Sequence, residues 1–177
     1  MIISDEKTLR AKNEPVTPEE AESLISLLES ELKNSEVMGR PGIGLACPQI
    51  GINKKAAIIR INESIKIDLV NATIKNSYGL AVFKDEGCLS FPDQLKDTER
   101  YQEIYITNNL VEPHSFVARG LIAVAIQHEL DHLDGILFGD REFKQTVVQK
   151  SKNRPNDPCN CGSGKKYKKC SLNLLRK

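Results

Sequence analysis

Residues 127–133 read Gln-His-Glu-Leu-Asp-His-Leu and contain two of the three histidines of the chain. Two histidines four positions apart lie on one face of a helix, so both imidazoles can reach a single metal ion. Glu129 lies beside them and can act as a general base toward water at that ion. For residues 128–132 taken alone, the alternative is a chance pair of histidines in the core or on the surface. The stretch predicts a helix that carries a catalytic metal site.

The sequence around this stretch predicts an α+β fold. A helix is expected over 121–133, with Gly135 placed to end it. Apolar or alternating runs at 56–61, 67–74, 79–83 and 101–107 have strand character, and a further short strand is expected near 116–117. The order of elements favours short antiparallel strands around a central helix, not alternating βαβ units.

An N-terminal helix is expected to begin after Thr17. Pro18 suits the first helical position, and Glu20 completes a capping box with Thr17. One helical face then carries apolar side chains, from Ala21, Leu24, Ile25, Leu28 and Leu32. This spacing predicts an amphipathic helix with one buried face.

A catalytic metal site needs a third protein ligand, and the residues offer two sources for it. The acids Asp134, Asp140 and Glu142 follow the helix, as a zinc peptidase of the zincin kind would require, but no matching motif surrounds them. Upstream, Cys88 lies in the segment 86–90, Glu-Gly-Cys-Leu-Ser. A lone cysteine is more often a small buried hydrophobe than a ligand, so Cys88 by itself does not settle the choice.

A third segment, residues 42–49, reads Gly-Ile-Gly-Leu-Ala-Cys-Pro-Gln. Its glycines allow a substrate backbone to approach closely. The side-chain amide of Gln49 can donate a hydrogen bond to a developing oxyanion. Taken alone, such a stretch is as well explained by a surface turn.

Together, these three segments resemble the peptide deformylase family. That family carries a G-x-G-L-A-x-x-Q loop, an E-G-C-L-S segment and a Q-H-E-x-D-H-L helix, and every defining position is present here. The resemblance covers about residues 1–143. It implies removal of the N-terminal formyl group from the formyl-methionine of nascent polypeptides. The alternatives are an HExxH metallopeptidase of another kind and a catalytically silent, deformylase-like binding protein.

The resemblance also implies a set of metal ligands, namely Cys88, His128 and His132. The usual ion of the family is Fe(II), which zinc, nickel or cobalt can replace, and a thiolate suits such ions. Charged residues near a metal site often orient it, and Glu86 and Arg100 are expected to do so without reacting.

Further roles follow from the same resemblance. Glu129 is expected to be the general base. The Gln49 side chain and the Leu89 backbone N–H are expected to stabilise the oxyanion. The methionine side chain of the substrate is expected in an apolar pocket lined by Ile43, Gly44, Val124 and Ala125.

The last part of the chain differs from the rest in charge. Residues 144–177 hold ten Lys or Arg and one acid, a net charge of +9, which leaves 15 basic and 23 acidic residues elsewhere. We therefore expect a catalytic domain at 1–143, a basic linker at 144–157 and a small basic module at 158–177. A basic module of this kind suits an acidic partner, such as the ribosome or ribosomal RNA.

The basic module resembles the SEC-C motif, a small zinc-binding unit. Cys159, Cys161 and Cys170 match three of its ligands, but Ser171 stands where a fourth Cys or His is usual. Structural zinc sites are normally closed by four protein ligands, so a structural zinc ion is expected to bind less tightly here. A disordered basic tail is the alternative.

Composition excludes some other classes of protein. No run approaches the roughly 18 apolar residues of a membrane helix. Trp is absent and aromatic residues make up 5% of the chain, which disfavours a base-stacking surface. The first residues lack the basic and apolar segments of a signal peptide, so the cytoplasm is the expected location.

Overall fold

The computed structural model describes residues 1–144, 156 and 166–169 of the 177-residue chain. The chain divides into two units, Met1–Phe143 and Lys144–Lys177, and each is described by itself. In the second unit, residues Tyr167–Lys169 form a single 3-10 turn, η3. The predicted zinc ligands Cys159, Cys161 and Cys170 lie outside the described residues. Among the described helices, none is both long enough and apolar enough to cross a membrane.

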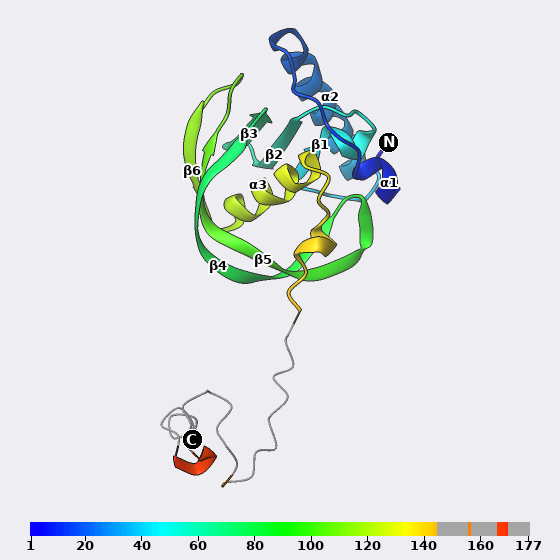
Figure 1. Ribbon diagram of the computed structural model, residues 1–177. Coiled ribbons are helices and arrows are strands. Elements are labelled where there is room, and N and C mark those ends of the chain that lie inside the picture. Colours follow the sequence, from blue (N-terminus) through cyan, green and yellow to red (C-terminus); the bar gives the residue numbers. More distant parts are fainter. Residues whose placement is uncertain (145–155, 157–165, 170–177) are drawn as a thin grey trace. The chain divides into compact units, whose positions relative to one another are not determined.

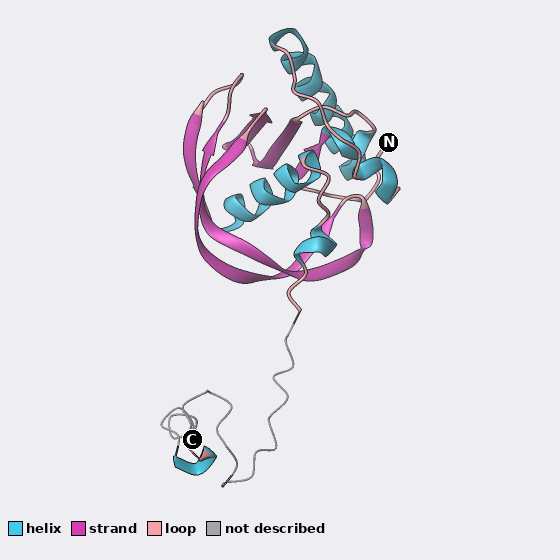
Figure 2. Ribbon diagram, viewed as in Figure 1, coloured by secondary structure: helices cyan, strands magenta, loops and turns pink. Residues whose placement is uncertain are grey.

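The first unit combines helices with two antiparallel sheets of three strands each. The sheets have the orders β1-β2-β3 and β4-β5-β6. In chain order the elements are α1 (Glu6–Leu9), α2 (Pro18–Val37), β1 (Gly44–Ala46), η1 (Cys47–Ile50), β2 (Ala56–Asn62), β3 (Ile65–Val70), β4 (Thr73–Cys88), β5 (Phe91–Thr107), β6 (Ser115–Arg119), α3 (Gly120–Leu133) and η2 (Phe138–Arg141). The α+β architecture with an N-terminal helix and a central HExxH helix is thus confirmed (Figures 1 and 2).

Helix α3 lies at the centre of this unit, with strands of both sheets around it (Figure 1). Its residues Ala123–Leu133 are all buried. A helix buried on every side carries its polar residues into the interior, where each needs a partner. Gly135 follows the helix with φ 71°, as the sequence predicted for a helix end.

Helix α2 begins where the sequence predicted. The Glu20 carboxylate accepts a hydrogen bond from the Thr17 backbone N–H at 2.9 Å. Ala21, Leu28 and Leu32 are buried on the face that packs toward β1 and β2. The core of this unit consists of two hydrophobic clusters. Helix α2 contributes its buried face to one of them, and helix α3 contributes to the other.

The strands differ from the sequence prediction in three ways. The short, buried strand β1 lies in the segment 42–49, for which the sequence allowed a surface turn. The expected strand at 67–74 is two strands, because Asn71 between them has φ 51° and its side chain bonds both the N–H and the C=O of Val16. The expected short strands at 79–83 and 101–107 are parts of one long hairpin, β4–β5, that curves around α3 (Figure 1). Residues 84–100 contain many charged side chains, so an apolar pattern in the sequence does not reveal the full length of these strands.

Candidate active site

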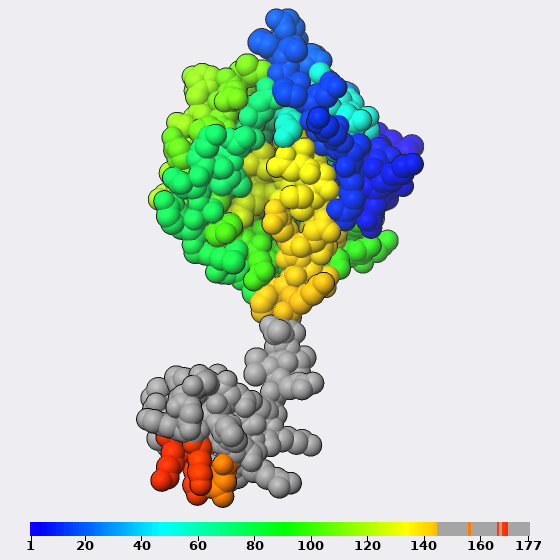
Figure 3. Space-filling model, in the orientation of Figure 1, coloured from blue at the N-terminus to red at the C-terminus, as the bar shows by residue number. Residues whose placement is uncertain are grey.

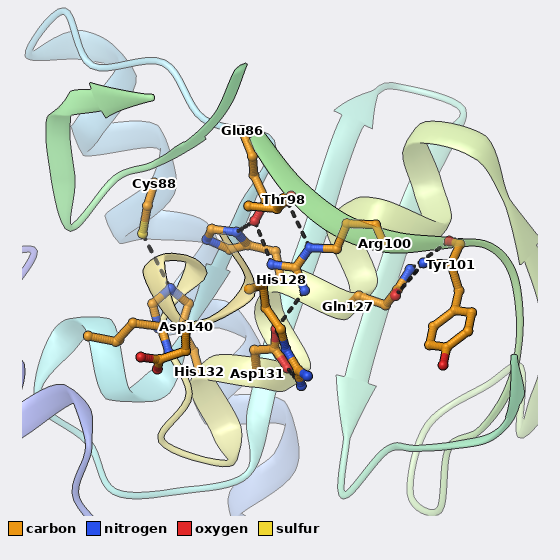
Figure 4. A network of polar contacts seen from close by, with 12 residues as sticks. Glu86, Cys88, Thr98, Arg100, Tyr101, Gln127, His128, Asp131, His132 and Asp140 are labelled. Atoms are coloured by element: carbon orange, nitrogen blue, oxygen red, sulfur yellow. Dashed lines mark hydrogen bonds and ion pairs between the residues drawn. The ribbon is translucent and has the colours of Figure 1, made fainter. Parts of the chain in front are cut away.

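Three side chains that could ligate a metal ion meet between the end of β4 and helix α3. The ligand atoms of Cys88, His128 and His132 all lie within 4.8 Å of one another, and all three residues are buried. The Cys88 Sγ atom is 3.3 Å from Nε2 of His132 (Figure 4). The structure thus brings together the three residues that the resemblance implied as ligands.

The spacing of these atoms fits a tetrahedral metal ion. Metal–sulfur and metal–nitrogen bonds of about 2.3 and 2.0 Å at a tetrahedral angle separate the two ligand atoms by roughly 3.5 Å. The observed separation between Cys88 Sγ and His132 Nε2 is close to this value. The second nitrogen of His128 is engaged elsewhere, because its Nδ1 lies 2.7 Å from Glu86 Oε1. Its Nε2 therefore remains for the ion.

An irregularity in β4 turns Glu86 and Cys88 toward the helix. The pairing of β4 with β5 shifts between Phe83 and Glu86, where Asp85 has φ 54°. A bulge of this kind re-aims the side chains that follow it. Both Glu86 and Cys88 are consequently buried on the face of the hairpin that meets α3.

Glu86 is the centre of a buried charge network behind His128. Arg100 donates to both Glu86 oxygens, at 2.8 and 2.6 Å, and Thr98 donates to one of them at 2.6 Å. Burial raises the pKa of Glu86, but the hydrogen bonds from His128 and Arg100 outweigh it and lower that pKa to about 2. Glu86 is therefore a carboxylate that fixes the tautomer and orientation of His128.

The two histidines are in different electrostatic environments. Burial disfavours the charged form of His128, yet the nearby Cys88 and the hydrogen bond to Glu86 prevail and raise its pKa to about 10. Burial, with the nearby positive charges of His128 and Arg100, lowers the pKa of His132 to about 3. A metal ion bound by these residues would displace a proton from His128 but not from His132, so its binding would weaken as the pH falls.

Glu129 lies beside the ligands with its carboxyl group buried. Burial raises the pKa of Glu129 to about 7, which suits a proton acceptor near neutral pH. Its Oε2 has no hydrogen-bond partner among the described residues. A buried polar atom of this kind is free to accept a proton from a reacting molecule.

Gly44 provides the space that Glu129 occupies. A Cβ atom built on Gly44 would overlap Glu129 Oε1 and come within 3.0 Å of Glu129 Cδ. Likewise, a Cβ on Gly42 would come within 2.5 Å of Leu89 Cδ1. A side chain at either glycine would therefore force Glu129 or Leu89 to move, whereas the sequence predicted that these glycines allow a substrate backbone to approach closely.

Gly44→Ala is therefore expected to displace the Glu129 carboxylate while the three metal ligands stay in place. A displacement of about 1 Å can cost on the order of 100-fold in rate, so we expect kcat/KM to fall by ~100-fold with metal content unchanged. Turnover of a formylated peptide and metal analysis of the same preparation check this. Wild-type turnover by the variant would contradict a precise placement of Glu129 by this loop.

The Gln49 side chain points into the site with a defined amide orientation. Its Oε1 accepts from the Ala46 backbone N–H at 2.8 Å, which directs Nε2 toward Cys88 Sγ at 3.6 Å and Ser90 Oγ at 3.4 Å. Gln49 is 1% exposed, so this donor acts in a dehydrated environment. Its position is suited to donating to a negative oxygen beside the metal ligands.

A cavity of about 470 Å³ opens onto these groups. Its lining includes the candidates for catalysis, Gln49, Leu89 and Glu129, and two of the three metal ligands, Cys88 and His128. The four residues expected to bind the methionine side chain, Ile43, Gly44, Val124 and Ala125, also line it. Leu121, Pro92 and Phe83 add apolar surface that the sequence did not single out.

The acids that follow α3 are engaged elsewhere. Asp134 pairs with Lys55 at 2.8 Å, Asp140 with Arg10 at 2.6 Å, and Glu142 with Lys96 at 3.0 Å. None of the three belongs to the metal-ligating group found among the described residues. A zincin-type third ligand from this segment is therefore not favoured.

Gln127 fixes the helix against the long hairpin, a role that the sequence left unassigned. Its amide donates to the Tyr101 C=O at 2.8 Å and accepts from the Tyr101 N–H at 3.0 Å (Figure 4). Tyr101 follows Arg100 directly. The two hydrogen bonds between Gln127 and Tyr101 therefore fix the position of His128 along β5 relative to the Glu86–Arg100 pair. Asp131, one helical turn after Gln127, accepts a hydrogen bond from Arg100 at 2.6 Å.

Comparisons with known proteins agree with this geometry. A model of the polypeptide deformylase family matches residues 1–149, which extends past the predicted domain boundary, and a SEC-C motif matches residues 156–170. Peptide deformylase of Heliobacterium modesticaldum is 39% identical over 135 residues, covering 75% of this chain and 86% of that protein. Peptide deformylase 1 of Bacillus subtilis is 47% identical over 106 residues, covering 58% and 66%. A crystal structure of a peptide deformylase from Synechococcus elongatus, in complex with actinonin, has a TM-score of 0.71 and 32% identity, covering 82% of this chain and 80% of that one.

Proposed function

The chain belongs to the polypeptide deformylase family, and from this we propose how its residues hydrolyse the formyl amide of a nascent polypeptide. The observation that carries the proposal is the convergence of Cys88, His128 and His132 next to the buried carboxyl of Glu129, at one end of a cavity. Hydrolysis of an amide needs a nucleophilic water, a base to take its proton and donors for the oxyanion. The site offers a residue for each requirement.

We propose that Cys88, His128 and His132 hold an Fe(II) ion, for which zinc, nickel or cobalt can substitute. One sulfur and two imidazole nitrogens suit divalent ions of this group, and three protein ligands leave a position open for reaction. When bound, such an ion supplies Lewis-acid polarisation and lowers the pKa of water toward neutrality. The Glu86–Arg100 pair holds His128 in the ligating orientation.

Glu129 accepts the proton of the attacking water and then delivers it to the leaving amine, with release of formate. The Gln49 Nε2 donor and the Leu89 backbone N–H stabilise the oxyanion that forms at the formyl carbon. Gln49 is buried and Leu89 is half-buried, and a hydrogen bond stabilises charge more strongly where water is excluded. These roles are those expected for a general acid–base hydrolase.

The substrate is a formyl-methionyl peptide. A formyl carbon carries a hydrogen where a longer acyl group carries a carbon chain, so side chains packed closely around the reacting carbon would exclude larger acyl groups. The apolar side chains of Ile43, Val124 and Ala125 provide contacts for the methionine side chain.

The proposal predicts a clear order of substrates. Formyl-Met-Ala-Ser should be hydrolysed at least ~100-fold faster than acetyl-Met-Ala-Ser, because the added methyl group must be accommodated beside the reacting carbon. Casein should remain intact. Amine release measured for all three by one assay checks this. Cleavage of casein would favour an HExxH endopeptidase, and no hydrolysis of any substrate by metal-loaded protein would favour a silent binding protein.

We propose further that the SEC-C motif holds a structural zinc ion and brings the enzyme to ribosomes in the cytoplasm. The motif contributes three cysteines, Cys159, Cys161 and Cys170, and residues 144–177 carry a net charge of +9. Such a charge density favours binding to phosphate-rich RNA, with counterion release as the driving force. Nascent formylated chains emerge from the ribosome, so this contact would raise the local substrate concentration.

Deletion of residues 151–177 is expected to weaken ribosome binding, measured by co-sedimentation over a range of salt concentrations, while turnover of a short formylated peptide is retained. The slope of log affinity against log salt should become less negative by roughly 0.7–0.9 for each phosphate that the shortened chain no longer neutralises. A full-length variant in which Lys165, Lys166, Lys168 and Lys169 become Gln separates charge from the cysteines. Ribosome binding by the deletion variant equal to that of the full chain would remove the tail from this role.

A further inference from the structure

Phe138, the first residue of η2, contacts both segments that carry metal ligands. Its ring stacks on Phe91 with centroids 5.8 Å apart and an interplanar angle of 21°, and Phe91 lies three residues after Cys88. The same ring lies 6.2 Å from the His128 imidazole in a tilted arrangement. Phe138 is 3% exposed, so it fills the space between the hairpin end and the helix.

Arg141, the last residue of η2, reaches His128 by a second, polar route. Its guanidinium donates to both Asp131 oxygens, at 2.8 and 3.1 Å. Asp131 accepts from Arg100 at 2.6 Å, and Arg100 in turn holds Glu86, which bonds Nδ1 of His128 (Figure 4). In this series of contacts each side chain forms a hydrogen bond or an ion pair with the next, which restricts the orientation of all of them.

The segment around η2 is itself fixed from several sides. Asp140 accepts from Arg10 at 2.6 and 3.1 Å, Phe143 N–H donates to the Asp97 C=O at 2.7 Å, and Glu142 pairs with Lys96. Figure 3 shows the atoms of this segment, in yellow to gold, between the N-terminal residues in blue and the strands in green. Such anchoring makes η2 a fixed support for the groups behind it.

We propose that η2 is a positioning element for the metal site, with Phe138 and Arg141 as its two positioning residues. Phe138 sets the spacing between the Cys88 segment and the His128 ring, and Arg141 keeps the Asp131–Arg100–Glu86 chain aligned on His128. Neither residue is among those that line the active-site cavity, so both act through other side chains. The inference rests on the proposed metal site at Cys88, His128 and His132.

The test measures metal binding directly. The variants are Phe138→Leu, Arg141→Gln and the conservative Arg141→Lys, each prepared as full-length apoprotein. Cobalt(II) affinity is measured by competition with a chelator, the visible spectrum of the cobalt form reports ligand geometry, and thermal unfolding reports stability. Leu28→Ala is the matched core control in the other hydrophobic cluster, and Arg119→Gln removes an ion pair of Arg119 with Glu103 on β5 and β6.

Phe138→Leu and Arg141→Gln are each expected to weaken cobalt binding by up to ~10-fold, less than the ~10–100-fold typical of losing a direct partner of a metal ligand, and to change the cobalt spectrum. Arg141→Lys should recover part of the affinity, since an ammonium restores the charge but not the two-point contact. Leu28→Ala should lower the unfolding temperature but keep the cobalt affinity and spectrum of the wild type. Arg119→Gln should leave the cobalt affinity and spectrum unchanged.

Wild-type cobalt affinity and spectrum in Phe138→Leu and Arg141→Gln, together with a lower unfolding temperature, would overturn the inference and leave η2 a purely structural element. The proposed metal site has its own readout, because Cys88→Ser in the same assay must weaken cobalt binding. An unchanged affinity in Cys88→Ser would overturn the metal site, and the role of η2 with it.

Discussion

Glu129→Ala is expected to lower kcat for a formyl-methionyl peptide by ~10²–10⁴-fold, the usual contribution of a positioned general base. The metal content per chain should stay unchanged, because Glu129 is not one of the three ligating residues. The buried Glu129 carboxyl, whose Oε2 lacks a partner among the described residues, is the group that we propose as the base. Steady-state kinetics and metal analysis on one preparation measure both quantities.

Two further variants sharpen this result. Glu129→Gln keeps the shape of the side chain and removes its basicity, so it should lose as much activity as Glu129→Ala. Glu22→Ala, exposed on α2, should be fully active. The unfolding temperature of apo Glu129→Ala should not fall below that of the wild type, because the variant removes a buried carboxyl whose pKa is raised by burial. Full turnover by either Glu129 variant would refute its role as the base.

Cys88→Ser is expected to reduce metal affinity by more than the ~100-fold that loss of an outer partner of a metal ligand typically costs. A hydroxyl is a poor ligand for Fe(II) or zinc compared with a thiolate, and only His128 and His132 would remain. Deformylation at low metal concentration should be lost and should return in part at high metal concentration. Chelator competition and activity as a function of added metal measure this.

Cys47 provides the matched control for that experiment. It is also a buried free thiol, but burial raises its pKa to about 12, which keeps it protonated and unreactive. It packs in the hydrophobic cluster with α2 and is not one of the metal-ligating group. Cys47→Ser should therefore lower stability and leave metal affinity unchanged. Equal losses of affinity in the two variants would argue against Cys88 as a ligand.

The sequence identified the elements with a local signal. Thr17, Pro18 and Glu20 marked the start of α2, and Gly135 marked the end of α3, because caps and breakers act within one or two turns of chain. The strand over 67–74 was interrupted in the structure, since Asn71 takes a left-handed conformation that is held by Val16, a residue distant in the sequence. An apolar pattern contains no information about such a partner.

The sequence by itself determined the chemistry of the site: the His128–Glu129–His132 spacing, the E-G-C-L-S segment with Cys88, and the glycine loop before Gln49 are local motifs. Only the tertiary structure decided how they combine. The bulge at Asp85 turns Glu86 and Cys88 inward, Gly44 leaves room for Glu129, and η2 packs behind His128. The physical reason is that a motif fixes which atoms are available, whereas their distances and pKa values depend on packing between segments far apart in the chain.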